Sequence, residues 1–288
     1  MIDARGLGLH HRFTAASSRL WWAVSIAALG GAIAILAAIF AFVFVRGIGS
    51  FNLALFTTVT SGIAGGLANA IAGTLLLVTI GLAIAAIVGI GTALWVVEFA
   101  PDWAARGVRF MIDVLAGVPS IVVGYFLYVA LVEGLGWGFS LVAGALALSI
   151  FVLPYVERSA DIALSNVPRE LREGAIALGA RPATTIFSID LPWSMPGILT
   201  GLLVAVGIGL GETAPLIYTA GWSSYMPSLA PTHSPVGYLT YVVWTYISQP
   251  FAAAHRLAYA AALLLMIFVF ITNLLARSFV EYRYGHKL

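Results

Sequence analysis

Six long apolar stretches constrain this chain more than any other feature. A helix that crosses a bilayer needs about 20 mostly apolar residues. The stretches are Leu20–Val45, Asn69–Val97, Val108–Val132, Phe139–Tyr155, Met195–Ala220 and Leu257–Ser278. Charged residues make up only 9% of the 288 residues, whereas a soluble domain carries about 25%. The sequence therefore predicts an all-α integral membrane protein with six transmembrane helices in one domain, residues 20–278.

The first stretch is expected to stay in the mature protein. Leu20–Val45 is longer than the roughly 7–15 apolar residues of a cleavable signal core, although basic residues precede it. We interpret residues 1–19 as an N-terminal tail and residues 279–288 as a C-terminal tail.

The distribution of basic residues predicts the orientation. Cytoplasmic loops are enriched in Lys and Arg. With six helices and the N-terminus inside, twelve of the 14 Lys and Arg residues are cytoplasmic, and only Arg46 and Arg256 lie outside. Both termini and the loop 156–192 are therefore expected in the cytoplasm.

Small residues recur at every fourth position in two of the predicted helices. They are Gly81, Ala85, Gly89 and Ala93 in one, and Gly197, Gly201, Ala205 and Gly209 in the other. Such ridges let helices approach closely in lipid. Packing within the bundle is the simpler interpretation, and an interface with a partner or a pathway is the alternative.

The loop 156–192 has the pattern of an amphipathic helix. Asn166 suits the capping position and Pro168 an early helical position. An apolar stripe follows and ends at Gly179, a typical helix stop; its members are Leu171, Ala175 and Leu178. The pattern predicts a helix over Pro168–Leu178 and a second short helix after Pro182. Such a helix usually docks into a groove, although a loop that only anchors the topology is the alternative.

The same loop resembles a known signature. Glu173-Gly174-Ala175, Gly179 and Ile189-Asp190-Leu191-Pro192 match the spacing of the EAA motif of ABC importer permeases, with Gly174 in place of an alanine. In that family the loop carries the coupling helix, which sits in a cleft of the ATPase subunit. The resemblance implies that the ATPase-coupling residues are Arg169, Arg172, Glu173, Gly174, Ala175, Gly179, Ile189, Leu191 and Pro192.

Three further stretches are similar to phosphate importer permeases of the PstA type. Gly211–Ile217 reads GETAPLI, Leu115–Val122 reads LAGVPSIV, and Gly65–Thr74 covers the start of the second helix. The sister permease, of the PstC type, normally has Met after Gly-Glu-Thr. One position departs from the pattern: Ile208 stands where many members have Arg, so no arginine that contacts the anion is assigned there.

The resemblance implies a type I importer permease for inorganic phosphate in the bacterial plasma membrane. Its expected partners are a PstC-type sister permease, a PstB-type ATPase dimer that binds ATP and Mg, and an external PstS-type phosphate-binding protein. The chain itself is expected to bind no cofactor and to contain no catalytic residue, and no GxxxxGK[ST] loop occurs in it. The aromatic segment Gly221–Pro250 could dock the binding protein or form an interfacial belt.

Other functions remain open at this point. The same fold could carry molybdate or sulfate, since nothing in the residues themselves selects phosphate. A secondary transporter driven by an ion gradient would normally show inverted repeats and more intramembrane ionisable groups. A membrane scaffold without transport would leave the loop pattern unexplained. The chain has no cysteine, and no metal site is expected.

Polar residues inside the apolar stretches are the candidates for a translocation pathway or gate. An ionisable group within the membrane is expensive and is usually functional, which singles out Glu212. Prolines there free backbone carbonyls and kink helices. The candidates are Glu212, Thr213, Pro215, Pro119 and Ser120. Arg109 and Asp113 are expected to form a local i, i+4 ion pair.

Overall fold

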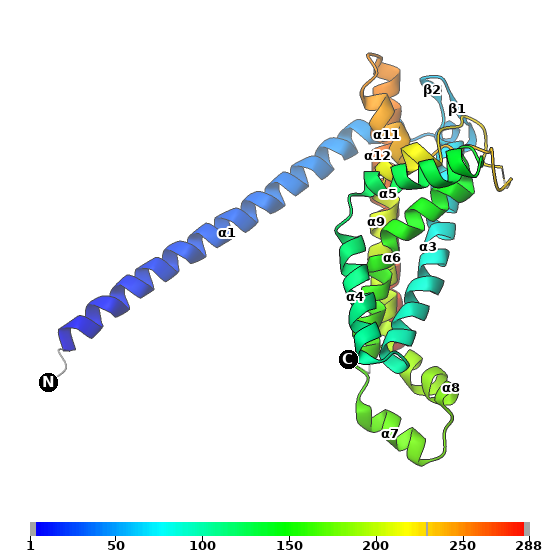
Figure 1. Ribbon diagram of the computed structural model, residues 1–288. Coiled ribbons are helices and arrows are strands. Elements are labelled where there is room, and N and C mark those ends of the chain that lie inside the picture. The colour runs from blue at the N-terminus through cyan, green and yellow to red at the C-terminus, as the bar shows by residue number, and fades with distance from the viewer. Residues whose placement is uncertain (1–3, 229, 285–288) are drawn as a thin grey trace.

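The computed structural model describes residues 4–228 and 230–284, which are mostly helical (Figure 1). One two-stranded antiparallel hairpin pairs Thr60 with Gly65. In chain order the elements are α1 (Ala4–Ile48), α2 (Leu53–Thr57), β1 (Thr60–Ser61), β2 (Ala64–Gly65), α3 (Ala68–Glu98), α4 (Asp102–Ala116), α5 (Ser120–Leu127), the π-helical η1 (Tyr128–Gly134), α6 (Leu141–Ser165), α7 (Arg169–Ala177), α8 (Pro182–Thr185), the π-helical η2 (Ile186–Asp190), α9 (Leu191–Gly211), α10 (Ala214–Thr219), α11 (Leu239–Ile247) and α12 (Ala252–Tyr284).

The membrane architecture expected from the sequence is confirmed. Five helical runs among the described residues are long and apolar enough to cross a bilayer, and the count reaches six if the bent helix pair is one span. The straight runs are Leu20–Ile48, Ala68–Glu98, Leu141–Ser165, Pro182–Gly211 and Ala252–Leu275.

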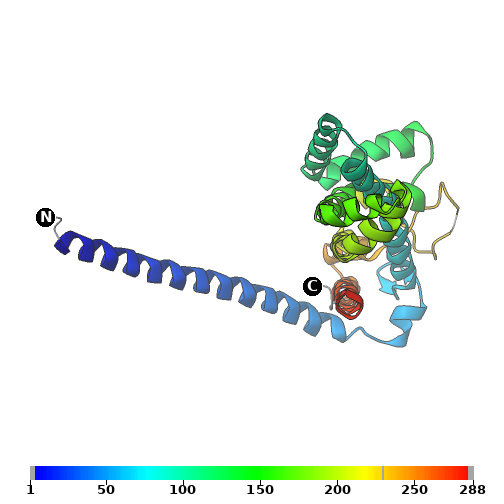
Figure 2. The same cartoon turned by 90° about the horizontal axis from the view of Figure 1, so that it is seen from below.

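Helix α1 projects away from the bundle (Figures 1 and 2). It begins at Ala4 rather than at the predicted Leu20, because no proline interrupts the chain from there to Ile48. Near its C-terminal end it packs against α12, where a Cβ added to Gly47 would overlap the backbone of Tyr259.

Two of the predicted spans are broken rather than continuous, so the predictions of single helices over Val108–Val132 and Met195–Ala220 are wrong. The first divides into α4 and α5, which meet at 98°. The second divides at Glu212 and Thr213 into α9 and α10. A proline clashes with the carbonyl four residues earlier. For Pro119 and Pro215 those residues are Leu115 and Gly211, within one residue of where α4 and α9 end.

The fourth span is longer than predicted. Helix α6 continues ten residues beyond Tyr155, because Val156, Ala160 and Leu164 are buried against neighbouring helices. The loop that follows α6 therefore starts at Asn166. Asn166 is the residue that ends α6, so its predicted role as the N-cap of the next helix is wrong.

The core is a tight stack in which α6 lies between α3 and α9, and the small residues make it possible. A Cβ added to Gly81 would lie 3.0 Å from the Ala145 carbonyl oxygen of α6. A Cβ added to Gly201 would overlap the Ser159 side chain, also on α6. The two ridges of small residues thus pack within the chain.

The two ends of the bundle differ (Figure 1). The short helices α7 and α8 lie at one end, and the hairpin and α11 lie at the other. The hairpin end is held by long-range hydrogen bonds: Tyr246 Oη donates to the Gly62 carbonyl at 2.6 Å, and Asn69 Nδ2 donates to the Ser223 carbonyl at 2.9 Å.

Candidate functional site

The predicted amphipathic helix of the loop is present as α7. Pro168 precedes it in an extended conformation, with φ −58° and ψ 132°. Gly179 follows at φ +83°, a left-handed conformation that glycine adopts without steric cost. The amide of Ala180 then donates to the Ala175 carbonyl at 3.0 Å. The predicted helix, one residue shorter at each end, and its glycine stop are both confirmed. The expected helical position of Pro168 is wrong, because Pro168 precedes the first turn.

Helix α7 presents most of its surface to solvent, and none of its residues is buried. Arg169, Glu173 and Gly174 are exposed, and Ala175 is half-buried. The apolar side chains of Ile176 and Leu178, at the end of the helix, are 64% and 91% exposed. The helix therefore carries an uncovered apolar surface bordered by charges.

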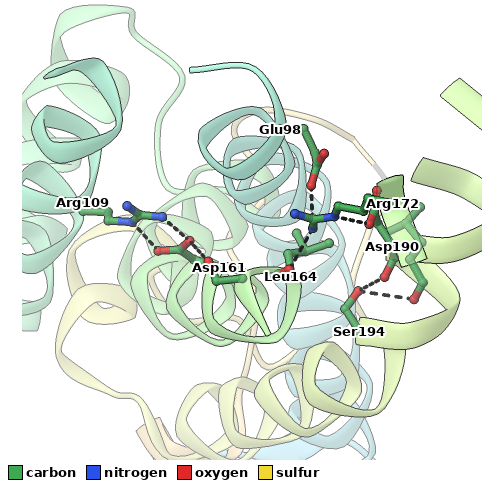
Figure 3. A network of polar contacts seen from close by, with 9 residues as sticks. Glu98, Arg109, Asp161, Leu164, Arg172, Asp190 and Ser194 are labelled. Atoms are coloured by element: carbon green, nitrogen blue, oxygen red, sulfur yellow. Dashed lines mark hydrogen bonds and ion pairs between the residues drawn. The ribbon is translucent and has the colours of Figure 1, made fainter. Parts of the chain in front are cut away.

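Arg172 is the inward-pointing exception on α7. Its guanidinium lies 2.7 Å from a carboxylate oxygen of Glu98 and 2.7 Å from one of Asp190 (Figure 3). The resemblance implies that Arg172 couples to the ATPase together with Arg169, whereas in the structure its side chain faces the ends of the membrane helices.

The second half of the motif is part of the bundle. The segment from Pro182 to Gly211 is one continuous helical run, in which η2 leads directly into α9. Ile189 and Leu191 are half-buried, and Leu191 packs against a cluster containing Ala93 and Ile198. Pro192 is the second residue of α9 and directly follows the π-helical turn of η2.

The two broken spans meet each other. Glu212, in the break between α9 and α10, lies beside Ser120, the first residue of α5. The hydroxyl of Thr240 donates to the Glu212 carbonyl at 2.7 Å. Thr213 adjoins Glu212, and Pro119 adjoins Ser120. The five candidate pathway residues therefore gather from two distant parts of the chain.

Close packing of α5 on α10 fixes this arrangement. A Cβ added to Gly124 would overlap Cα of Pro215 and lie 2.9 Å from its carbonyl oxygen. The ring of Tyr125 packs edge-on against Tyr218, with centroids 5.8 Å apart. The two short helices consequently form one unit beside Glu212.

Sequence reasoning missed several residues beside Glu212. A small cavity of about 10 Å³ is lined by Glu212, Thr74, Tyr238 and Thr240, among others; it is roughly large enough for one water. The Tyr238 hydroxyl is buried and has no hydrogen-bond partner among the described residues. Burial raises the pKa of the Tyr238 phenol, so the hydroxyl is a neutral donor. The only sequence signal for Tyr238 is its position in the aromatic-rich segment Gly221–Pro250.

A second ion pair joins α4 to α6. Arg109 donates to both carboxylate oxygens of Asp161, at 2.7 and 2.8 Å (Figure 3). The predicted local pair with Asp113 is wrong, because the extension of α6 brings Asp161 within reach of Arg109. Asp113 instead lies 3.8 Å from Arg158. Glu157, one turn before Asp161, is buried with both oxygens unpartnered among the described residues.

Comparisons with known proteins agree with this geometry. Residues 85–282 match the family described as "Binding-protein-dependent transport system inner membrane component". The phosphate transport system permease protein PstA 2 of Mycobacterium bovis is 42% identical over 258 residues, covering 90% of this chain and 86% of that relative. PstA of Yersinia pestis is 38% identical over 244 residues, covering 81% of this chain and 79% of the relative.

A solved structure shares the fold. An inward-facing MetNI methionine ABC transporter chain superposes with a TM-score of 0.63 at 18% identity, covering 75% of this chain and 95% of the other. The chain therefore belongs to the binding-protein-dependent transport system inner membrane components, as a PstA-type permease with the type I importer fold.

Proposed function

We propose that this chain is a membrane subunit of an ATP-driven importer of inorganic phosphate. The similarity to PstA proteins over 90% of the chain supports the substrate assignment, because those relatives are named for phosphate transport. The chain would form the translocation pathway together with a PstC-type sister permease, in the bacterial plasma membrane. No observation favours molybdate or sulfate.

The single observation that carries the coupling role is the uncovered apolar surface of α7. A nine-residue helix without one buried residue gains little from packing on its own chain, so a partner is expected to cover it. The exposed Leu178, Ile176 and Glu173 supply the apolar and acidic contacts for a groove on a PstB-type ATPase. That ATPase would bind the ATP and Mg, and this chain would bind neither.

The orientation follows from the charges. With α7 and α8 on the cytoplasmic side, the end that holds the hairpin and α11 faces outward (Figure 1). Trp222 and Tyr241 stack there, with ring centroids 4.5 Å apart. A PstS-type binding protein would deliver phosphate at this outer end.

The broken spans supply a mechanism for gating. Interrupted helices expose helix ends and free carbonyls, which transporters use at substrate sites. Nucleotide binding in the ATPase would move α7 and then the helices attached to it. That movement would rearrange the contact of Glu212 with Ser120 and open the pathway alternately to each side.

Purification and reconstitution test the proposal. The complete complex in lipid vesicles is expected to take up radiolabelled phosphate with ATP and binding protein, and excess sulfate or molybdate should not compete. Competition by molybdate would reassign the substrate. Glu173→Lys is expected to reduce ATPase co-purification, because it reverses an exposed charge on α7. If the ATPase still binds when residues 166–181 are scrambled, the coupling assignment is wrong.

A further inference from the structure

Helix α7 is attached to the rest of the molecule by few contacts. It has no buried residue, and none of its residues belongs to the hydrophobic clusters of the described chain. The chain turns sharply on both sides of it, at Pro168 and at Gly179. A movement imposed on α7 alone would therefore be absorbed in those turns unless another contact carried it onward.

Arg172 makes that contact. Its Nε donates to Asp190 Oδ1 at 2.7 Å, and its Nη2 donates to the Leu164 carbonyl at 3.0 Å (Figure 3). The same Nη2 lies 2.7 Å from Glu98 Oε1. Asp190 is held in turn, because Ser194 Oγ donates to its carbonyl at 2.6 Å.

Each of these partners lies on a different membrane helix. Glu98 is the last residue of α3, Leu164 lies one residue before the end of α6, and Asp190 directly precedes α9. These are the three helices that pack together through their small residues. One guanidinium therefore touches the ends of all three.

Burial makes the contacts rigid. The side chain of Asp190 is fully buried, and those of Glu98 and Arg172 are only 16% and 20% exposed. The second oxygen of Asp190 has no hydrogen-bond partner among the described residues, so its charge depends on Arg172. A planar guanidinium fixes the directions of two hydrogen bonds, to Asp190 and to the Leu164 carbonyl, while its charge pairs with Glu98. The ammonium of a lysine does not reproduce this arrangement.

We infer that Arg172 is a positioning residue that transmits the movement of α7 to α3, α6 and α9, and that it does not contact the ATPase. This inference rests on the proposed function, in which an ATPase docks on α7. Arg169, one turn earlier and exposed, is the matched cation that remains free to contact the ATPase.

The test uses the complete importer in lipid vesicles, with inorganic phosphate, ATP and binding protein. Three quantities are measured together: ATPase retained on purification, ATP hydrolysed, and phosphate taken up. We compare the wild type with Arg172→Gln, Arg172→Lys and the control Arg169→Gln.

Arg172→Gln should retain the ATPase at wild-type level and lower the phosphate moved per ATP by about 2- to 30-fold, the usual range for coupling networks. Arg172→Lys should not restore the ratio. Arg169→Gln should weaken ATPase retention and leave the ratio unchanged.

Removing Arg172 also leaves the buried Asp190 carboxylate without its positively charged partner, which can prevent folding. The double variant Arg172→Gln with Asp190→Asn removes both charges and keeps the test decisive. It should fold and show the same loss of coupling as Arg172→Gln alone, because the effects of substitutions within one network are not additive.

The inference is overturned if Arg172→Gln, or the double variant, moves as much phosphate per ATP as the wild type. It is equally overturned if these variants lose the ATPase as Arg169→Gln does while the bound remainder stays fully coupled. A wild-type complex that takes up no phosphate refutes the proposed function instead, and the inference with it.

Discussion

Replacing Gly124 with alanine tests the contact between the two broken spans. The new Cβ would overlap Cα of Pro215 and lie 2.9 Å from its carbonyl oxygen. These are backbone atoms, so the overlap is relieved only if α10 moves away from α5. Overpacking of this kind costs about 1–3 kcal/mol, and the helix gains up to about 1 kcal/mol from losing a glycine. We expect a net destabilisation of about 2 kcal/mol, since a backbone neighbour yields less than a side chain.

The matched control is Gly91→Ala in α3, where no atom lies within 4 Å of the added Cβ. It should stabilise the protein by about 0.5–1 kcal/mol through helix propensity alone. Thermal unfolding of both purified variants in detergent measures the difference, and the melting temperatures should shift in opposite directions. Gly124→Ala should also lower phosphate uptake, because the displaced α10 carries Glu212 away from Ser120. Equal shifts of the same sign would refute the described α5–α10 contact.

Three pairs of substitutions test the remaining features. Asp161→Asn should cost about 1–3 kcal/mol in thermal unfolding because it weakens a charged two-point hydrogen bond, whereas Glu157→Gln should cost less than about 1 kcal/mol because neither Glu157 oxygen has a partner to lose. Gly174→Ala should slow amide hydrogen exchange in α7 by favouring the helix, and Gly179→Ala should accelerate it because alanine at φ +83° is strained; the same sign for both would contradict the assigned glycine stop. Glu212→Gln should retain most phosphate uptake, since glutamine keeps the size and the polar oxygen of the side chain beside Ser120, and Glu212→Ala should lose it; a loss in both would show that uptake needs the carboxylate charge.

Much of the architecture could be predicted because lipid imposes simple rules. The apolar stretches, the helix in the cytoplasmic loop and its stop at Gly179 all follow from local sequence. The breaks beside Pro119 and Pro215 could also have been predicted, since each proline excludes the helical hydrogen bond at its own position. A kink at each proline is compatible with one continuous span, so the expectation of single helices joins α4 to α5 and α9 to α10.

Contacts between distant residues could not be predicted in the same way. Helix α6 continues to Ser165 because neighbouring helices bury its apolar face, and the loop sequence alone gives no sign of those helices. Arg109 consequently finds Asp161 rather than Asp113. Arg172 is grouped with Arg169 because both lie in the loop that resembles the EAA motif, and only the tertiary fold brings Glu98 and Asp190 to Arg172.

The most direct test of the central claim is the energy source of phosphate uptake. Vesicles containing the complete importer should accumulate phosphate only when ATP is present on the side of α7. Uptake should continue after ion gradients are collapsed, and it should stop when the ATPase partner is inactive. Uptake without ATP, driven by an ion gradient, would contradict the account and favour a secondary transporter.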